Sequence, residues 1–234
     1  MIVLILGSGP NVTQAAGWPR APFDRIVAIN NAWQVRPDWD DLIHPSDFAP
    51  DRQPTSLRDG QRIITFEDYV PAQNALGGFV YGGGTMAFTA GYWALHALRP
   101  SVLAYLGCDM TYDQSKTHFY GTGTADPLRS DVTLRSLEAK SARLQAMAHR
   151  QGCACLNLSS DPSRLVFGRG RPDALSPRPN LMPDLNQAAI DHALQLEQEA
   201  GYMVESGKYW KEESRFNTDV IDEIDAAWLA TLAQ

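Results

Sequence analysis

Cysteine is scarce in this chain. Only Cys108, Cys153 and Cys155 occur among its 234 residues, and three thiols cannot all pair with one another. The alternation Cys153-Ala-Cys155 places two thiols on one face of a strand and lacks the spacing of a metal loop. We therefore expect buried free thiols in a reducing compartment, rather than a disulfide framework or a zinc site.

Long apolar runs are also missing. The first apolar segment covers residues 1–6, whereas a helix that crosses a bilayer needs about 20 apolar residues. No basic region precedes this segment, and no small-residue cleavage site follows a long apolar stretch. The sequence therefore predicts a cytoplasmic protein without a membrane span.

Basic residues are outnumbered by acidic ones, 20 Lys and Arg against 27 Asp and Glu, which gives a net charge of −7. This balance argues against a broad nucleic-acid interface, although a local patch could still bind a phosphorylated small molecule. The 44% hydrophobic and 20% charged residues are typical of a soluble globular protein. The composition is compatible with either a monomer or a homo-oligomer.

Three common active-site motifs are absent. The chain has neither the G-x-x-x-x-G-K-[ST] phosphate loop nor the G-x-S-x-G nucleophile elbow. Its first glycine turn, Gly7-Ser-Gly9, does not complete the dinucleotide motif G-x-G-x-x-G, because Thr13 stands near the third glycine position. The P-loop, serine hydrolase and NAD-binding classes therefore lose their main support.

What the chain does contain is a repeated order of apolar strand, turn and helix over residues 1–158. Expected strands cover residues 2–6, 25–29, 40–43, 62–66, 102–106 and 153–158. Expected helices cover residues 12–17, 86–98 and 131–151, with two more after residue 185. This order predicts a single Rossmann-like, doubly wound, mostly parallel sheet with helices on both faces. We assign residues 1–165 to the nucleotide-binding domain, and residues 166–234 to a proline- and arginine-rich segment and a C-terminal helical extension packed on it.

Polar residues follow the expected strands where each of them ends. Ligands of parallel sheets bind outside the carboxyl ends of the strands, so these residues should face one cleft. Glycines at Gly7 and Gly9 permit positive φ and leave N–H groups for an anion, as does the run Gly82–Gly84 before a helix. Tight turns and helix caps are the structural alternatives. The predicted ligand-binding residues are Gly7, Ser8, Gly9, Pro10, Asn11, Asn30, Asn31, Ser46, Asp47, Gly84, Thr85, Gly107 and Asp109.

The polar segment 111–129 follows a core strand and has the length of an active-site loop. It contains His118, whose pKa range suits a general base, beside Tyr112 and Tyr120. His44 is the other loop histidine, whereas His96 and His149 fall within helices and are expected to be packing or surface residues. Asp109 and Asp113, with Asp47, could hold Mg²⁺ against a phosphate, although hydrogen bonds to loop amides are the commoner role of such aspartates.

Five segments carry a family resemblance: residues 5–11, 28–31, 44–46, 84–98 and 106–109. They resemble the bacterial sialyltransferases that use CMP-sialic acid, and the related pterin pyrophosphokinase-like Rossmann proteins. The resemblance implies a cytidine nucleotide bound by the first glycine turn and Asn30, with Ser46 and Thr85 near its sugar and phosphate. It also implies that Tyr112 and Tyr120 bind the phosphate.

The general base departs from the family pattern. The family's base is a histidine just before the long helix, where this chain reads Asp126-Pro-Leu-Arg-Ser-Asp131. Either His118 or Asp126 takes that role, or the nucleotide sugar serves another reaction.

The leading hypothesis is a nucleotide-sugar-dependent glycosyltransferase with a CMP-linked donor and no required cofactor. In it His118 deprotonates the acceptor while Tyr112 and Tyr120 steady the leaving phosphate. Two alternatives stay open. One is a Mg²⁺-dependent pyrophosphokinase-like enzyme with Asp109 or Asp47 as ligand. The other is a noncatalytic Rossmann-like module whose C-terminal helices bind a protein.

Overall fold

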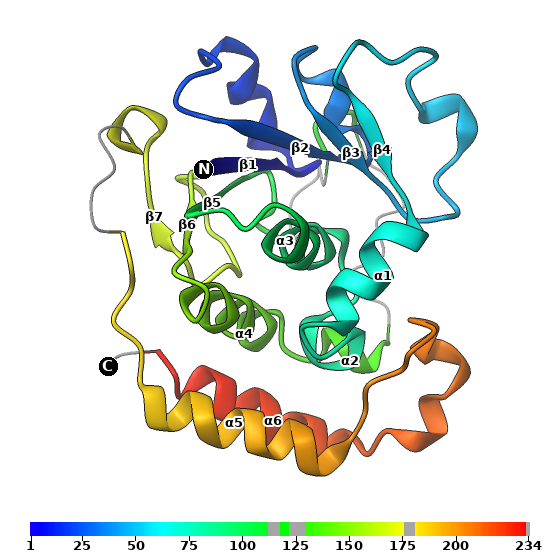
Figure 1. The fold of residues 1–234 in the computed structure, drawn as a ribbon, viewed down its shortest axis with the longest axis vertical. Helices are drawn as coiled ribbons and strands as arrows, with labels where there is room; N and C mark the ends of the chain where they lie inside the picture. Colours follow the sequence, from blue (N-terminus) through cyan, green and yellow to red (C-terminus); the bar gives the residue numbers. More distant parts are fainter. Residues whose placement is uncertain (112–117, 122–129, 176–180, 233–234) are drawn as a thin grey trace.

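A sheet of seven parallel strands forms the centre of the computed structural model, which describes residues 1–111, 118–121, 130–175 and 181–232 (Figure 1). The strands are β1 (Ile2–Leu6), β2 (Arg25–Ile29), β3 (Asp41–Ile43), β4 (Arg62–Ile64), β5 (Val102–Leu106), β6 (Ala154–Asn157) and β7 (Gly168–Arg169). Their order is β4-β3-β2-β1-β5-β6-β7, and every neighbouring pair is parallel. The predicted Rossmann-like α/β fold is confirmed.

The strand order reverses between β1 and β5. The chain builds β2, β3 and β4 outward on one side of β1, then crosses back to place β5 on the other side. Such a switch point opens a crevice at the strand carboxyl ends, because the two flanking connections leave toward opposite faces of the sheet. The first glycine turn follows β1 at this crevice.

The two faces of the sheet are covered by different kinds of helix. Val3 and Ile5 pack into a core with the α-helices, whereas Leu4 and Leu6 pack with Val12 of a 3-10 helix on the other face. The α-helices are α1 (Phe66–Asn74), α2 (Phe79–Gly82), α3 (Met86–Ala97), α4 (Leu137–His149), α5 (Gln187–Ala200) and α6 (Thr218–Leu229). The 3-10 helices are η1 (Pro10–Gly17), η2 (Asn30–Gln34), η3 (Pro50–Arg52), η4 (Val132–Leu134), η5 (Pro172–Leu175), η6 (Tyr209–Lys211) and η7 (Glu213–Arg215). In the described part of the chain, no helix has both the length and the apolar character needed to cross a membrane.

Helices α5 and α6 form a third layer over α4 (Figure 1). The polar face of α4 is therefore covered by protein, and two of its cations are buried in ion pairs. Lys140 Nζ lies 2.6 Å from Asp225 Oδ1 on α6, and Arg143 Nε lies 2.6 Å from Glu197 Oε1 on α5. These pairs attach the C-terminal helices to the helix that packs on the sheet.

Helix α1 replaces the end of a predicted strand. We expected a strand over residues 62–66, but β4 ends at Ile64 and α1 begins at Phe66. The helix begins in a capping box, in which the Thr65 N–H donates to Asp68 Oδ2 at 2.8 Å. The sequence Thr65-x-x-Asp68 carries this signal, because a capping box satisfies N–H groups that a helix start leaves unpaired.

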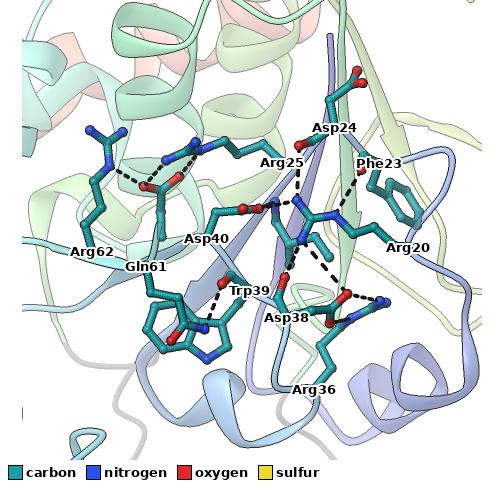
Figure 2. A network of polar contacts seen from close by, with 12 residues as sticks. Arg20, Phe23, Asp24, Arg25, Arg36, Asp38, Trp39, Asp40, Gln61 and Arg62 are labelled. Carbon is teal, nitrogen blue, oxygen red and sulfur yellow. Dashed lines mark hydrogen bonds and ion pairs between the residues drawn. The ribbon is translucent and has the colours of Figure 1, made fainter. Parts of the chain in front are cut away.

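A polar network closes the amino end of the sheet, away from the crevice (Figure 2). Asp41, the first residue of β3, is fully buried and accepts hydrogen bonds from Arg25 at 2.7 Å and Arg62 at 2.5 Å. The two arginines begin β2 and β4, so one carboxylate joins three strands. Arg20 and Asp40 add a further ion pair with 2.6 Å between Nη2 and Oδ2.

The three cysteines are buried free thiols, as the sequence predicted. Burial raises the pKa of Cys153 to about 12 and raises the pKa of Cys108 and Cys155 further above the usual range. A protonated thiol in the core is a weak nucleophile. We therefore assign the cysteines to packing.

Candidate functional site

A cleft of about 850 Å³ lies at the carboxyl ends of β1, β2, β3 and β5. It is bounded by the strand-end turns and by the N-terminal end of α3. The predicted residues that line it are Gly7, Ser8, Gly9, Pro10, Asn11, Asn30, Ser46, Asp47, Gly84, Thr85, Gly107, Asp109 and His118. These residues come from distant parts of the chain and were selected because ligands of parallel sheets bind at the strand carboxyl ends. In the structure they line one cavity.

Two predicted site residues, Asn31 and Tyr120, do not line the described cleft, and a third lies outside the described residues. Asn31 is 5% exposed in η2 and lies outside the cavity. Tyr120 is 44% exposed and stacks on His118, with 4.9 Å between the ring centroids, without lining the cavity. Tyr112 lies outside the described residues, as do Asp113 and Asp126.

The first glycine turn packs against β5 and does not adopt the conformation expected for it. Neither Gly7 nor Gly9 has a positive φ. Their N–H groups donate to Leu106 O and Gly107 O, each at 2.8 Å, so they are not left for an anion. A Cβ on Gly7 would lie 2.2 Å from Gly107 O. Glycine is needed here because two backbones approach each other, which corrects the expectation of a phosphate nest.

The second glycine run also serves close packing. The Gly84 N–H donates to Thr133 Oγ1 at 3.0 Å, and a Cβ on Gly84 would lie 2.6 Å from that oxygen and from the Tyr209 hydroxyl. The next residues, Met86 and Ala87, line the cleft as the first two residues of α3. N–H groups in the first turn of a helix have no partner within the helix, and they carry its partial positive charge. The start of α3 therefore places helix N–H groups without an intrahelical partner at this cleft.

Two asparagine side chains in the cleft have an unsatisfied acceptor. The Oδ1 atoms of Asn11 and Asn30 are buried and have no hydrogen-bond donor among the described residues. Both residues line the cleft. A buried acceptor without a partner costs about 1–3 kcal/mol, and a ligand donor in the cleft would offset this cost at both residues.

Strained backbone occurs at the same strand ends. Asn30, directly after β2, has a φ of 52°, and Met110, shortly after β5, has a φ of 55°. Both residues line the cleft. Left-handed backbone at residues other than glycine is costly and collects at ligand sites. The strain therefore coincides with the unsatisfied amide of Asn30.

Asp109 is held by the side-chain amides of Asn11 on η1 and Asn157 at the end of β6. Its Oδ2 accepts from Asn11 Nδ2 at 2.7 Å, and its Oδ1 accepts from Asn157 Nδ2 at 3.0 Å. Asn11 Nδ2 also lies 2.7 Å from Ser159 Oγ and 2.9 Å from Asp161 Oδ2. These bonds fix the ends of β5 and β6 against η1, and they explain why only the amide oxygen of Asn11 lacks a partner.

His118 is held over the first glycine turn by its neighbour. The Phe119 N–H donates to Ser8 O at 3.0 Å, and the His118 side chain lines the cleft with 9% of its surface exposed. Burial lowers the pKa of His118 from its ordinary value of 6.5. The imidazole is then neutral at pH 7 and able to accept a proton.

We expect the titration midpoint of His118 to lie below 6.5, because burial disfavours the charged ring. The measurement is the pH dependence of its ring Cε1–H resonance by NMR, assigned with a His118→Gln variant. A midpoint at or above 6.5 would contradict this account of its environment.

Part of the cleft wall was missed at the level of sequence. The aromatic residues Phe66, Tyr69, Phe79, Tyr209 and Trp210 line it, as do the carboxylates of Asp131, Asp161 and Glu213. The first three belong to helices that the strand pattern did not reveal. Tyr209, Trp210 and Glu213 belong to the C-terminal extension, and the sequence carried no signal that this segment returns to the strand ends.

Charge in the described cleft is of one sign. Five carboxylates line it, from Asp47, Asp109, Asp131, Asp161 and Glu213, and the described lining includes no lysine or arginine. Within the same described residues, no three His, Cys, Asp or Glu side chains are grouped so as to hold a metal ion. Anionic groups of a ligand therefore meet neutral donors, backbone N–H groups and hydroxyl side chains, rather than cations in this part of the cleft.

Comparison of the chain with protein-family models, with curated proteins and with solved structures gives no match.

Proposed function

We propose that the protein is a glycosyltransferase that binds a nucleotide sugar in the cleft at the strand carboxyl ends. The main support for the proposal is that the Oδ1 atoms of Asn11 and Asn30, in one cavity, have no hydrogen-bond donor among the described residues. A nucleotide sugar supplies hydroxyl and amino donors that would satisfy both acceptors. The choice of a CMP-linked donor rests on the resemblance of the strand-end segments to the CMP-sialic-acid-dependent sialyltransferases.

The start of α3 is the proposed site of the phosphate. Met86 and Ala87 present first-turn N–H groups there, and Thr85 caps the helix by accepting from the Phe88 N–H at 3.4 Å. The helix terminus favours negative charge, so it would bind the phosphate and stabilise it as it leaves. This supports a site in which backbone groups, rather than cationic side chains, bind the anion.

His118 is the proposed base for transfer. An acceptor hydroxyl oxygen would bond to the anomeric carbon of the donor, while the bond from that carbon to the phosphate oxygen breaks. The electron pair of the broken bond leaves with the nucleotide phosphate, and the hydroxyl proton passes to the neutral His118 ring. Its place in the lining and its lowered pKa support this role.

Thermal-shift measurements on the full chain with CMP, CDP, UDP and ATP, each with and without Mg²⁺, test the proposal. We expect CMP to raise the melting temperature without added metal. Stabilisation by ATP that requires Mg²⁺ would instead favour a pyrophosphokinase-like enzyme. A panel with no shift would overturn both enzyme proposals in favour of a noncatalytic module.

Asn30→Gly is expected to leave the free energy of unfolding unchanged or to raise it by up to about 1 kcal/mol. Glycine relieves the positive φ of 52° and removes a buried acceptor that has no donor. The greater freedom of glycine in the unfolded chain offsets part of the gain. Urea unfolding of the ligand-free protein measures the difference, and a loss of more than about 1 kcal/mol would show that Asn30 stabilises the fold itself.

A further inference from the structure

Five aromatic rings form a continuous wall along the side of the cleft built by α1, α2 and η6. The ring centroids of successive pairs are 5.8 Å apart for Phe66 and Tyr69 and 6.4 Å apart for Tyr69 and Phe79. The wall continues with 6.3 Å between Phe79 and Tyr209 and 5.3 Å between Tyr209 and Trp210. All five residues, which we call the aromatic wall, line the cavity.

Three residues of the aromatic wall are buried in the core, and the residue at its end, Trp210, is exposed. Tyr69, Phe79 and Tyr209 are 5%, 8% and 4% exposed, whereas Trp210 is 53% exposed. A tryptophan at the end of a buried aromatic chain has its position fixed by its neighbour while much of its indole surface faces solvent. Rigid aromatic surface in a cavity is typical of a site that binds an apolar face of a ligand.

Acceptors for hydroxyl groups accompany the aromatic wall. Asp131 Oδ2 accepts from the Tyr209 hydroxyl at 2.8 Å, and its Oδ1 accepts from the Thr133 N–H at 2.8 Å. This carboxylate is thereby held at the cavity, and Glu213, three residues after Trp210, also lines it. A ligand beside these groups should present hydroxyl donors and carry no negative charge.

We propose that the aromatic wall binds the acceptor substrate, a neutral pyranoside whose apolar C–H face stacks on Trp210. Its hydroxyl groups donate to the carboxylates of Asp131 and Glu213. The inference rests on the proposed glycosyltransferase function and names the substrate class of its second subsite. The nucleotide is assigned to Asn11, Asn30 and the start of α3, where the unsatisfied acceptors and the helix terminus occur. The two subsites adjoin at Gly84, which packs against the Tyr209 hydroxyl.

Binding of methyl β-glucopyranoside and methyl β-galactopyranoside to the full chain, followed by saturation-transfer NMR, tests the subsite. We expect both glycosides to bind the wild-type protein and glucuronic acid to bind more weakly, since carboxylates repel its charge. Trp210→Ala should weaken glycoside binding by about tenfold, and Trp210→Phe should retain most of it. Leu57→Ala, which removes another exposed apolar side chain outside the cleft, is the matched control.

The thermal shift with CMP, measured on the same variants, separates the possible failures. A shift that is unchanged in Trp210→Ala, together with lost glycoside binding, supports the subsite. Loss of the CMP shift in Trp210→Ala would overturn the inference, because the ring would then serve the nucleotide. Absence of glycoside binding in a wild-type protein that CMP stabilises would overturn it as well. Glycoside binding without any nucleotide shift would overturn the proposed function and support a sugar site alone.

Discussion

Glu197→Gln is expected to lower the free energy of unfolding by about 3–5 kcal/mol, because it leaves a buried guanidinium without its counter-charge. Arg143 is 1% exposed and Glu197 is 7% exposed. The guanidinium donates to both oxygens of Glu197, at 2.6 and 2.8 Å, and to the Tyr92 hydroxyl at 2.8 Å. Trp228 on α6 donates to Glu197 Oε1 at 2.7 Å, so one carboxylate joins α4, α5 and α6.

The expected loss corresponds to a fall in melting temperature of roughly 10 °C for a chain of this size. In the wild-type protein, burial lowers the pKa of Arg143, but the charge of Glu197 and the Tyr92 hydroxyl raise it above its usual value. Arginine side chains are not deprotonated in proteins, so the variant keeps a buried cation without its counter-charge. Glu199→Gln is the matched control, since Glu199 is exposed on the same helix and its change should cost under about 0.5 kcal/mol. Equal melting temperatures for the two variants would contradict the role given to the buried pair.

Gly7→Ala is expected to destabilise the protein by about 3 kcal/mol, at the upper end of the cost of overpacking. The added Cβ would lie 2.2 Å from Gly107 O and 2.5 Å from the Cys108 sulfur. The first of these atoms belongs to the backbone and cannot rotate away, so β1 and β5 would have to separate at the cleft. Urea unfolding measures the loss.

Gly17→Ala, at the end of η1, provides the control for this substitution. A Cβ on Gly17 meets no heavy atom within 4 Å, and its φ is not positive. The free energy of unfolding of Gly17→Ala should differ from that of the wild-type protein by less than about 0.5 kcal/mol. If Gly7→Ala were tolerated as well as Gly17→Ala, the close approach of the two strand ends would not be a constraint.

The parallel sheet was predictable because its signal is local. Unbroken apolar runs at β1 and β5, each ending in a glycine turn, identify strands buried on both faces. The strand-end rule then placed Asn30, Ser46 and Thr85 at one cavity without knowledge of any contact. At Gly7, the sequence alone could not distinguish a glycine required for close packing of two backbones from a glycine that leaves N–H groups for an anion.

The sequence did not predict which residues the third layer, α5 and α6, would bury. Helix α4 looks amphipathic, and Arg143 on it is indistinguishable in the sequence from a solvated arginine. Its burial follows from α5, which is distant in the chain and supplies Glu197. The same long-range return brings Tyr209 and Trp210 to the cleft, and no periodicity in the sequence encodes that contact.

Calorimetric titration of CMP into the wild-type chain, Asn30→Gly and Asn31→Ala tests the central claim most directly. Asn30 lines the cleft with an unsatisfied acceptor, whereas its neighbour Asn31 is buried outside the cavity. We predict that CMP binds the wild-type protein and Asn31→Ala with similar affinity, and binds Asn30→Gly about tenfold more weakly, the effect of one lost hydrogen bond. Equal CMP affinity for the wild-type protein and Asn30→Gly, or no CMP binding to the wild-type protein, would contradict it.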